Sequence, residues 1–231
     1  MKATPASRPD PLAEARALLR RGGPATLATL DGQGGPFATL TSYSTAPDGA
    51  PILLLSTLSA HTRHLLADPR AALLVAPPSP RGDPLDAARL TVSGRVVRDA
   101  AEATRIRHLA RNPKARLYAG FGDFAFFRLE PAGVHFNGGF GRAAPLALAD
   151  VTGPAAPALA AGEADILAEL AADPSRLAAL ADAPGVKGWK AIGVDAFGLD
   201  LLRGRQPARV GFAAPATTPE AWAAALAAIP A

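Results

Sequence analysis

Short apolar runs separated by glycine- and proline-rich turns dominate the first 137 residues of the chain. The clearest turn is Asp31-Gly32-Gln33-Gly34-Gly35, which separates the runs 24–30 and 36–45 and is typical of a hairpin. A second turn, at 46–50, leads into the run 51–57. Chains punctuated in this way bury one face of each strand, which favours a closed or packed antiparallel sheet.

The same part of the chain contains further expected strands and a few short helices. The expected strands are 70–76, 88–98 and the pair 124–130 and 132–137, which flank Pro131-Ala132-Gly133. The expected helices are 11–21, 59–67 and 100–117, the last interrupted near Asn112-Pro113, and 77–86 is expected to be a loop. About six strands with few long helices predict an antiparallel barrel over residues 1–150.

The C-terminal third has a different character. Residues 138–162 are rich in Gly, Ala and Pro, and 152–162 is expected to be a linker. Beyond it we expect a helix at 163–182, strands at 189–195, 198–203 and 207–212, and a closing helix at 218–229. Thr218 is the expected N-cap of that last helix, because Pro219 follows at the first helical position. Residues 151–231 are therefore predicted to form a small α+β domain.

Composition excludes several classes of function. The chain has no cysteine among its 231 residues, which excludes disulfides, thiolate metal sites and a cysteine nucleophile. Its arginines are scattered, and the only basic run is Arg105, Arg107, Arg111, Lys114 and Arg116. We interpret that run as the solvated face of a helix, so no nucleic-acid partner is expected. Residues 1–10 lack the apolar core of a signal peptide, and the chain has no apolar run long enough to suggest a membrane span. A cytoplasmic location is therefore expected.

The segment from Ser56 to Arg63 is suited to binding phosphate. The run 51–57 ends in hydroxyls, and a helix then opens on Ser59 with His61 and Thr62 in its first turn. The unpaired N–H groups and positive dipole end of a helix N-terminus attract anions. The alternative is a strand, a turn and a capped helix with no ligand.

The run 36–45 carries an unusual number of hydroxyl groups. Strand alternation places Thr39, Thr41 and Tyr43 on one face and Ser42 on the other. A ligand-facing strand explains this pattern, and so does an edge strand with one wet face.

Two further candidates follow at the end of the barrel segment. His135 lies on the opposite strand face from Val134 and Phe136, where it is either a ligand contact, such as an axial haem ligand, or a structural residue. The run 138–142 combines glycines, which permit close backbone approach, with the fixed charge of Arg142. The alternative for that run is a flexible exit from the barrel.

In this order, the elements resemble the split-barrel flavoproteins related to pyridoxamine 5′-phosphate oxidase, and within them the HugZ-type haem-utilisation branch. The resemblance rests on Ala28-Thr29-Leu30 with 35–43, on 56–63 with Asp68-Pro69-Arg70, and on 198–201 with 209–212. It covers nearly the whole chain from about residue 12.

The resemblance implies an FMN-dependent oxidoreductase with haem as a second ligand, in which a homodimer holds FMN in a groove between its subunits. It implies that the FMN phosphate is held by Ser56, Ser59, His61, Thr62 and Arg63. It also implies that Thr39, Thr41, Ser42 and Tyr43 face the flavin ring or ribityl chain. Related barrels carry a segment like that of Arg142 near the flavin or haem pocket.

The chain also departs from its relatives. Thr and Ser stand where the oxidase carries basic side chains on the strand 39–44, so oxidation of pyridoxamine phosphate is not expected. The family's His-Met-Asn-x-Asp-His segment is replaced here by Glu169-Leu170-Ala171-Ala172-Asp173-Pro174. Two alternatives to a flavoenzyme therefore stay open: a non-enzymatic haem-binding or regulatory module, and an interaction scaffold on the same fold.

Overall fold

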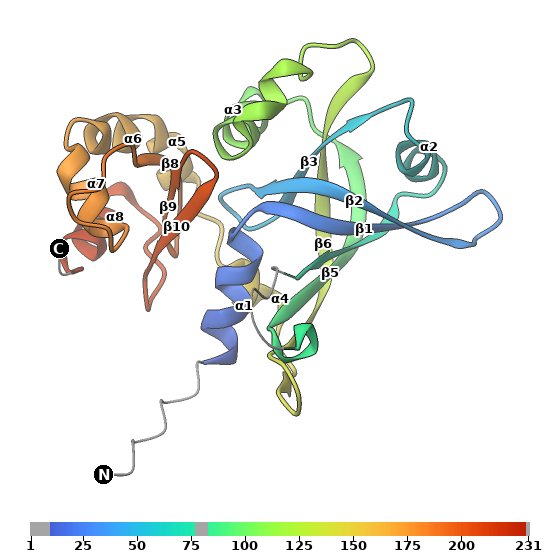
Figure 1. Ribbon diagram of the computed structural model, residues 1–231, viewed down its shortest axis with the longest axis horizontal. Helices are drawn as coiled ribbons and strands as arrows, with labels where there is room; N and C mark the ends of the chain where they lie inside the picture. Colours follow the sequence, from blue (N-terminus) through green and yellow to red (C-terminus); the bar gives the residue numbers. More distant parts are fainter. Residues whose placement is uncertain (1–9, 77–82, 230–231) are drawn as a thin grey trace.

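The computed structural model describes residues 10–76 and 83–229. Its larger part is built from the strands β1 (Gly23–Leu30), β2 (Pro36–Thr45), β3 (Pro51–Ser56), β4 (Arg70–Val75), β5 (Arg89–Arg98) and β6 (Phe124–Asn137) (Figure 1). They lie in the order β3-β2-β1-β4-β5-β6, and all their pairings are antiparallel. Because β3 also pairs with β6, the sheet closes into a barrel. The predicted antiparallel split barrel is confirmed.

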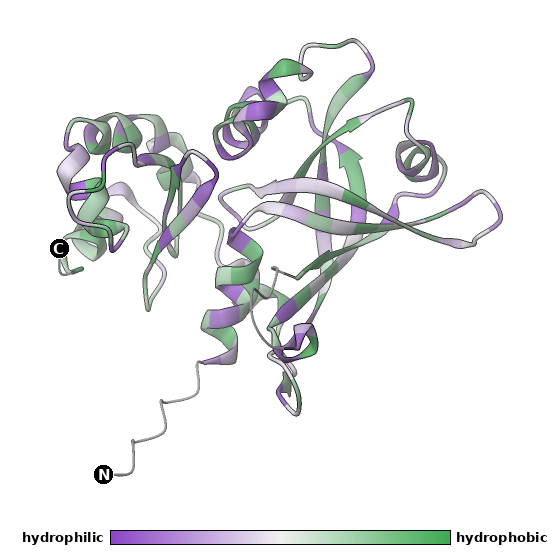
Figure 2. Ribbon diagram, in the orientation of Figure 1, coloured by the Kyte–Doolittle hydropathy of each residue, from purple (hydrophilic) through white to green (hydrophobic). Residues whose placement is uncertain are grey.

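One face of each strand fills the barrel interior. Pairing aligns Leu27, Leu73, Val92 and Val134 in one row across four strands, and the first three are fully buried. This row follows from strand alternation, which sends every second side chain inward. In Figure 2 the hairpin of β1 and β2 is pale, because small and hydroxyl-bearing residues rather than large apolar ones make up much of it.

The strand β6 is continuous, so the predicted break into 124–130 and 132–137 is wrong. The register against β5 shifts between Ser93 and Gly94, which leaves Ala132 as an extra residue in β6. A bulge of this kind accommodates Pro131, which has no N–H to donate to a ladder. The turn-like sequence around Pro131 therefore marks a bulge within one strand.

Helices cover the ends and one side of the barrel. The helix α1 (Pro11–Arg20) inserts Ala15, Leu18 and Leu19 into the barrel core, and the Asp10 carboxylate accepts hydrogen bonds from its first amides. The other elements are α2 (Ala60–Ala67), the 3-10 helix η1 (Pro84–Asp86), α3 (Glu102–Arg111) and the 3-10 helix η2 (Pro113–Leu117). The predicted break near Asn112-Pro113 is confirmed. Of the predicted loop 77–86, residues 77–82 lie outside the described ranges, and η1 occupies part of the rest.

The stretch 138–182 is more helical than its composition suggests. It contains the short strand β7 (Ala143–Ala144) and the helices α4 (Leu148–Thr152), α5 (Pro157–Ala161), α6 (Glu163–Ala171) and α7 (Pro174–Leu180). The predicted linker 152–162 is wrong, because α5 buries Leu159 in the C-terminal core. The predicted single helix 163–182 is also wrong: Pro174 starts a new helix, and the Asp173 carboxylate caps it by accepting from the Arg176 amide.

The C-terminal part forms its own sheet and core, which confirms the predicted small α+β unit. Its elements are β8 (Lys190–Asp195), β9 (Gly198–Arg203), β10 (Gln206–Gly211) and α8 (Pro219–Ala227). Thr218 caps α8 as predicted, since its Oγ1 accepts from the Ala221 amide at 3.2 Å. Both tryptophans, Trp189 and Trp222, are buried in this core. None of the helices in the described ranges has the length and apolarity needed to cross a bilayer.

The C-terminal sheet lies beside α1 (Figure 1), and buried charges join it to the barrel. Arg20, at the end of α1, lies 3.0 Å from the Asp195 carboxylate, and both side chains are 1% exposed. The same carboxylate is 2.8 Å from Arg209, which also pairs with Asp200 at 2.6 Å. Two cations and two carboxylates thus balance one another in a largely buried network.

A second buried pair extends this junction. Arg107 of α3 pairs with Glu163 of α6 and donates hydrogen bonds to the carbonyls of Thr45 and Val194. The interpretation of the basic run as a solvated face is therefore wrong for Arg107, which is 6% exposed. Only the closing of the C-terminal part onto α3 buries it.

Candidate functional site

The start of α2 brings together four of the predicted phosphate ligands. The Ser59 Oγ donates to the Ser56 carbonyl at 2.6 Å, and it lies 2.8 Å from both the His61 Nε2 and the Thr62 Oγ1. These groups therefore bind one another, and Ser59 makes no capping hydrogen bond to the helix. The first amides of α2 are left without a side-chain cap, so they remain available to an anion.

A carboxylate lies beside this cluster. The Ser56 Oγ donates to the Asp123 carboxylate at 2.5 Å, and the Asp123 carbonyl accepts from the Thr57 amide. The pairing of β3 with β6 brings Asp123 here from 67 residues away. Sequence reasoning missed Asp123, because nothing in the local pattern connects it with Ser56. Its charge repels a phosphate from this end of the cluster.

The positive charge available to a phosphate is small. Arg63 is exposed and donates to the Leu58 carbonyl at 2.7 Å. Burial, followed by the neighbouring His64, lowers the pKa of His61, which disfavours the charged form of its ring. One arginine therefore faces a dianion next to the Asp123 carboxylate, and this set of donors does not fit a flavin phosphate well.

The hydroxyl-rich strand divides between core and surface. Tyr43 is fully buried, its hydroxyl donates to the Leu18 carbonyl at 2.9 Å, and burial raises its pKa. Thr39 and Thr41 lie on the same inward side and are partly buried, whereas Ser42 is exposed on the outer side. The predicted division of the faces is confirmed. It makes the Tyr43 side chain a part of the barrel core.

Arg142 lies far along β6 from the α2 cluster. Ser56 pairs with Phe124 at the start of the 14-residue strand, whereas Arg142 follows its end. The guanidinium of Arg142 donates to the Gly138 carbonyl at 2.7 Å and pairs with Glu14 of α1 at 2.8 Å. The structure thus gives Arg142 a local role in fixing the β6–β7 turn to α1, and does not bring it to the other predicted ligands.

The outer face of the barrel offers a different surface. Pairing aligns Leu40, Thr26, Leu74, Thr91 and His135 in one row across five strands. A neighbouring row consists of small residues: Ala38, Ala28, Ala72, Ser93 and Gly133. Leu40 is 74% exposed, and a cavity of about 360 Å³ is lined by Pro24, Thr26, Leu40 and Leu74 among others. This curved outer surface therefore combines small, hydroxyl-bearing and apolar side chains, with the imidazole of His135 at one end of the row.

His135 is the most available of the four histidines. Its side chain is exposed, on the strand face opposite the buried Phe136, and no hydrogen bond to it is found among the described residues. His108 is buried with its Nδ1 3.1 Å from the Ser44 Oγ, and burial lowers its pKa to about 4. His64 has its Nδ1 3.2 Å from the Thr29 Oγ1. Only His135, within the described ranges, keeps both ring nitrogens free for a ligand.

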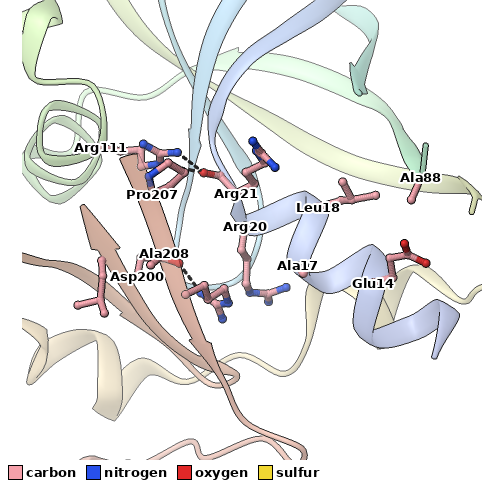
Figure 3. Close-up of a pocket in the computed structure, with 12 residues that line it drawn as sticks. Glu14, Ala17, Leu18, Arg20, Arg21, Ala88, Arg111, Asp200, Pro207 and Ala208 are labelled. Carbon is pink, nitrogen blue, oxygen red and sulfur yellow. Dashed lines mark hydrogen bonds and ion pairs between the residues drawn. The ribbon is translucent and has the colours of Figure 1, made fainter. Parts of the chain in front are cut away.

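A further cavity lies between the barrel and the C-terminal sheet (Figure 3). It measures about 440 Å³ and separates α1 from β9 and β10. Figure 3 shows Arg111 reaching across to the backbone of Arg21, and its Nε donates to that carbonyl at 2.9 Å. Sequence reasoning did not select Arg21 or this cavity, because the cavity exists only where two separately folded sheets meet.

Comparison with known proteins agrees with this architecture. Residues 12–138 match the family model described as pyridoxamine 5′-phosphate oxidase. The chain belongs to the pyridoxamine 5′-phosphate oxidase family. The chain is similar to a solved structure of a protein of unknown function from Agrobacterium tumefaciens, which is 33% identical, with 99% of both chains covered and a TM-score of 0.80.

Two similar proteins have names that refer to haem. A haem-binding protein from Mycobacterium smegmatis is 32% identical, with 96% of both chains covered and a TM-score of 0.59. The non-canonical chloroplastic haem oxygenase HOZ from Arabidopsis thaliana is 37% identical over 142 residues. These residues make up 58% of the present chain and 42% of HOZ. The chain thus spans less than half the length of that curated relative.

Proposed function

We propose that the protein binds haem against the outer face of its barrel, where the imidazole of His135 would hold the iron. The observation that carries this proposal is the exposed position of His135 on the outer face, where both ring nitrogens are free of hydrogen bonds to the described residues. Imidazole is a common ligand of haem iron, and nearby apolar side chains such as Leu74 suit the macrocycle. The names of the relatives from M. smegmatis and A. thaliana support the same ligand.

The likeness to HOZ supports a further step, in which haem is the substrate of an oxidoreductase. The haem iron would supply the redox chemistry once bound. The chain would hold the iron through His135, and Leu74 would help to exclude water from the bound macrocycle. Addition of a reductant such as ascorbate to the haem complex in air tests this step. A Soret band that decays to biliverdin-like absorbance supports an enzyme, and a stable band supports a binding module.

Haem titration tests the binding proposal. We expect a Soret band in the wild type that is weakened or shifted in His135→Ala, because the imidazole that would hold the iron is lost. His64→Ala is the matched control, since His64 already contacts Thr29 and is expected to keep the wild-type spectrum. An unchanged spectrum in His135→Ala would overturn the role of that residue, and a wild type without a Soret band would overturn haem binding.

FMN binding at the start of α2 stays a prediction, favoured by the uncapped amides and opposed by Asp123. A desalting experiment decides it: flavin absorbance retained by the wild type and lost in a His61→Ala, Arg63→Ala double variant would support the predicted site. A wild type that retains no flavin would overturn it.

We also propose a homodimer in which two copies pair through the outer face, with the ligand held between them. The 74% exposure of Leu40 supports this proposal, because a large apolar side chain there gains by being covered. Light scattering should report two chains per particle, and Leu40→Glu should shift the particle toward one.

A further inference from the structure

A second cavity at the junction adjoins the one in Figure 3 and shares Arg21, Arg111 and Pro207 with it. It measures about 280 Å³ and is built from four separate parts of the chain. These are the start of β1, the outer side of β2 at Ser42, the segment from Arg111 to Tyr118, and the turn between β9 and β10.

The charges of this cavity all have one sign. Four cationic side chains line it: Arg21, Arg111, Lys114 and Arg205. No acidic residue is among the described residues that line it, and none of the four cations forms an ion pair with any described residue. Like charges held together repel, so a bound anion would stabilise this arrangement.

The arginines of the neighbouring junction differ from these four cations, because each of them pairs with a carboxylate. Arg20, Arg107 and Arg209 each face a carboxylate in the buried network. Of the four cations of the cavity, Arg111 is half-buried and feels the charge of Asp200, which acts to raise its pKa, but it forms no ion pair. Arg21, Lys114 and Arg205 are exposed and solvated by water. An anion that enters the cavity would therefore meet four positive charges and no carboxylate among the described residues that line it.

The backbone at residues 21 and 22 holds the Arg111 side chain in position. Arg111 is fixed by hydrogen bonds from its Nε and Nη2 to the Arg21 carbonyl. Gly22, with φ of +63°, makes room for it, because a Cβ there would lie 2.7 Å from the Arg111 Nε. Partial burial lowers the pKa of Arg111, as expected of a cation with reduced hydration, and such a cation gains more from pairing with an anion.

The rest of the lining is suited to an organic molecule. Pro24, Leu202 and Pro207 supply apolar walls, and Ser42 and Tyr118 add a hydroxyl each. Lys114 and Arg205 are exposed at the rim, so their long side chains can close on a ligand without disturbing the fold. A few polar groups on apolar walls are typical of a small-molecule site.

We propose that this cavity binds the carboxylate or phosphate groups of a small organic anion, with Arg21, Arg111, Lys114 and Arg205 as their partners. Two sources can supply such groups. One is the pair of propionate carboxylates of haem, and this version rests on the proposed function. The other is a free metabolite that carries phosphate. The cavity shares Arg21, Gly22 and Pro24 with the apolar cavity of the outer face, so one amphipathic ligand can contact both.

The test compares two double variants of the full chain. Lys114→Gln with Arg205→Gln removes the two rim cations, and Arg176→Gln with Lys187→Gln removes one exposed arginine and one exposed lysine elsewhere. Pyrophosphate is titrated by calorimetry, and haem and haem dimethyl ester are titrated by their Soret bands. Charge-assisted contacts predict that the rim variant binds its anion roughly tenfold or more weakly, while the control binds as the wild type does.

The outcomes separate the two sources and the two proposals. Weaker binding of haem but not of its dimethyl ester in the rim variant assigns the cavity to the propionates. Weaker binding of pyrophosphate assigns it to a free phosphate, and this arm stands even where the wild type binds no haem. Equal affinities of the rim and control variants for haem and pyrophosphate, or no binding of either by the wild type, would overturn the proposal.

Discussion

His108 is a buried histidine whose charge state the fold controls. Its ring is 1% exposed, and burial lowers its pKa to about 4. The unfolded chain binds a proton at about pH 6.5, so the neutral folded form contributes stability that is complete above that pH and is lost as the pH falls toward 4. We expect the free energy of unfolding to fall by roughly 1–3 kcal/mol between pH 7 and pH 4.5 from this group. Denaturant titrations across that range should show a shallower dependence in His108→Gln than in the wild type.

Single residues also show what the sequence could and could not predict about the site. Ser59, His61 and Thr62 are neighbours in the chain, so a helix start brings them together whatever the rest of the fold does. The approach of Asp123 to Ser56 and the burial of Tyr43 depend on barrel closure across distant strands. Local spacing therefore predicts a cluster but not its net charge.

At the scale of elements, the bulge in β6 depends on a glycine in its partner strand. A Cβ on Gly94 would lie 2.0 Å from the Glu130 carbonyl oxygen, closer than any backbone tolerates without moving. We expect Gly94→Ala to lower the free energy of unfolding by about 1–3 kcal/mol, the usual cost of overpacking. Gly120→Ala is the control, because nothing lies within 4 Å of a Cβ there. Equal denaturation midpoints for the two variants would contradict the role of Gly94.

The elements that were predicted well are those with explicit start and stop signals. The turn at 31–35 sets the hairpin of β1 and β2, and Thr218 with Pro219 sets the start of α8. Two errors share one cause, because a proline has several structural uses. Pro131 lies at a bulge inside a strand, and Pro174 opens a second helix. Local sequence does not distinguish a bulge from a turn, since only the partner strand defines the bulge.

At the scale of the molecule, the docking of the C-terminal sheet onto the barrel could not be predicted from the sequence. The charges that join them come from Arg20, Arg107, Asp195 and Arg209, which are spread over most of the chain and show no shared periodicity. Their pairing is decided by how α1, α3 and the C-terminal sheet meet. The cationic cavity next to them has the same origin, so a site of this kind is visible only in the assembled fold.

Asp195 provides the test of this docking. Burial alone would raise its pKa, but the charges of Arg209 and Arg20 outweigh burial and hold it below the ordinary aspartate value. Asp195→Asn leaves the buried guanidinium of Arg20 without a counter-charge, whereas Arg209 keeps its pairing with Asp200. The substitution should therefore lower the free energy of unfolding at pH 7 by about 3–5 kcal/mol.

Trp189 and Trp222 are the only tryptophans and both lie in the C-terminal core, so fluorescence reports the loss of that part directly. Asp165→Asn, which removes an exposed carboxylate that forms no ion pair with the described residues, is expected to unfold as the wild type does. Because a depressed carboxyl pKa stabilises the fold only while the group is charged, the difference between wild type and Asp195→Asn should shrink as the pH falls below about 4. A fluorescence transition in Asp195→Asn that matches the control at pH 7 would show that the ion network does not hold the C-terminal sheet in place.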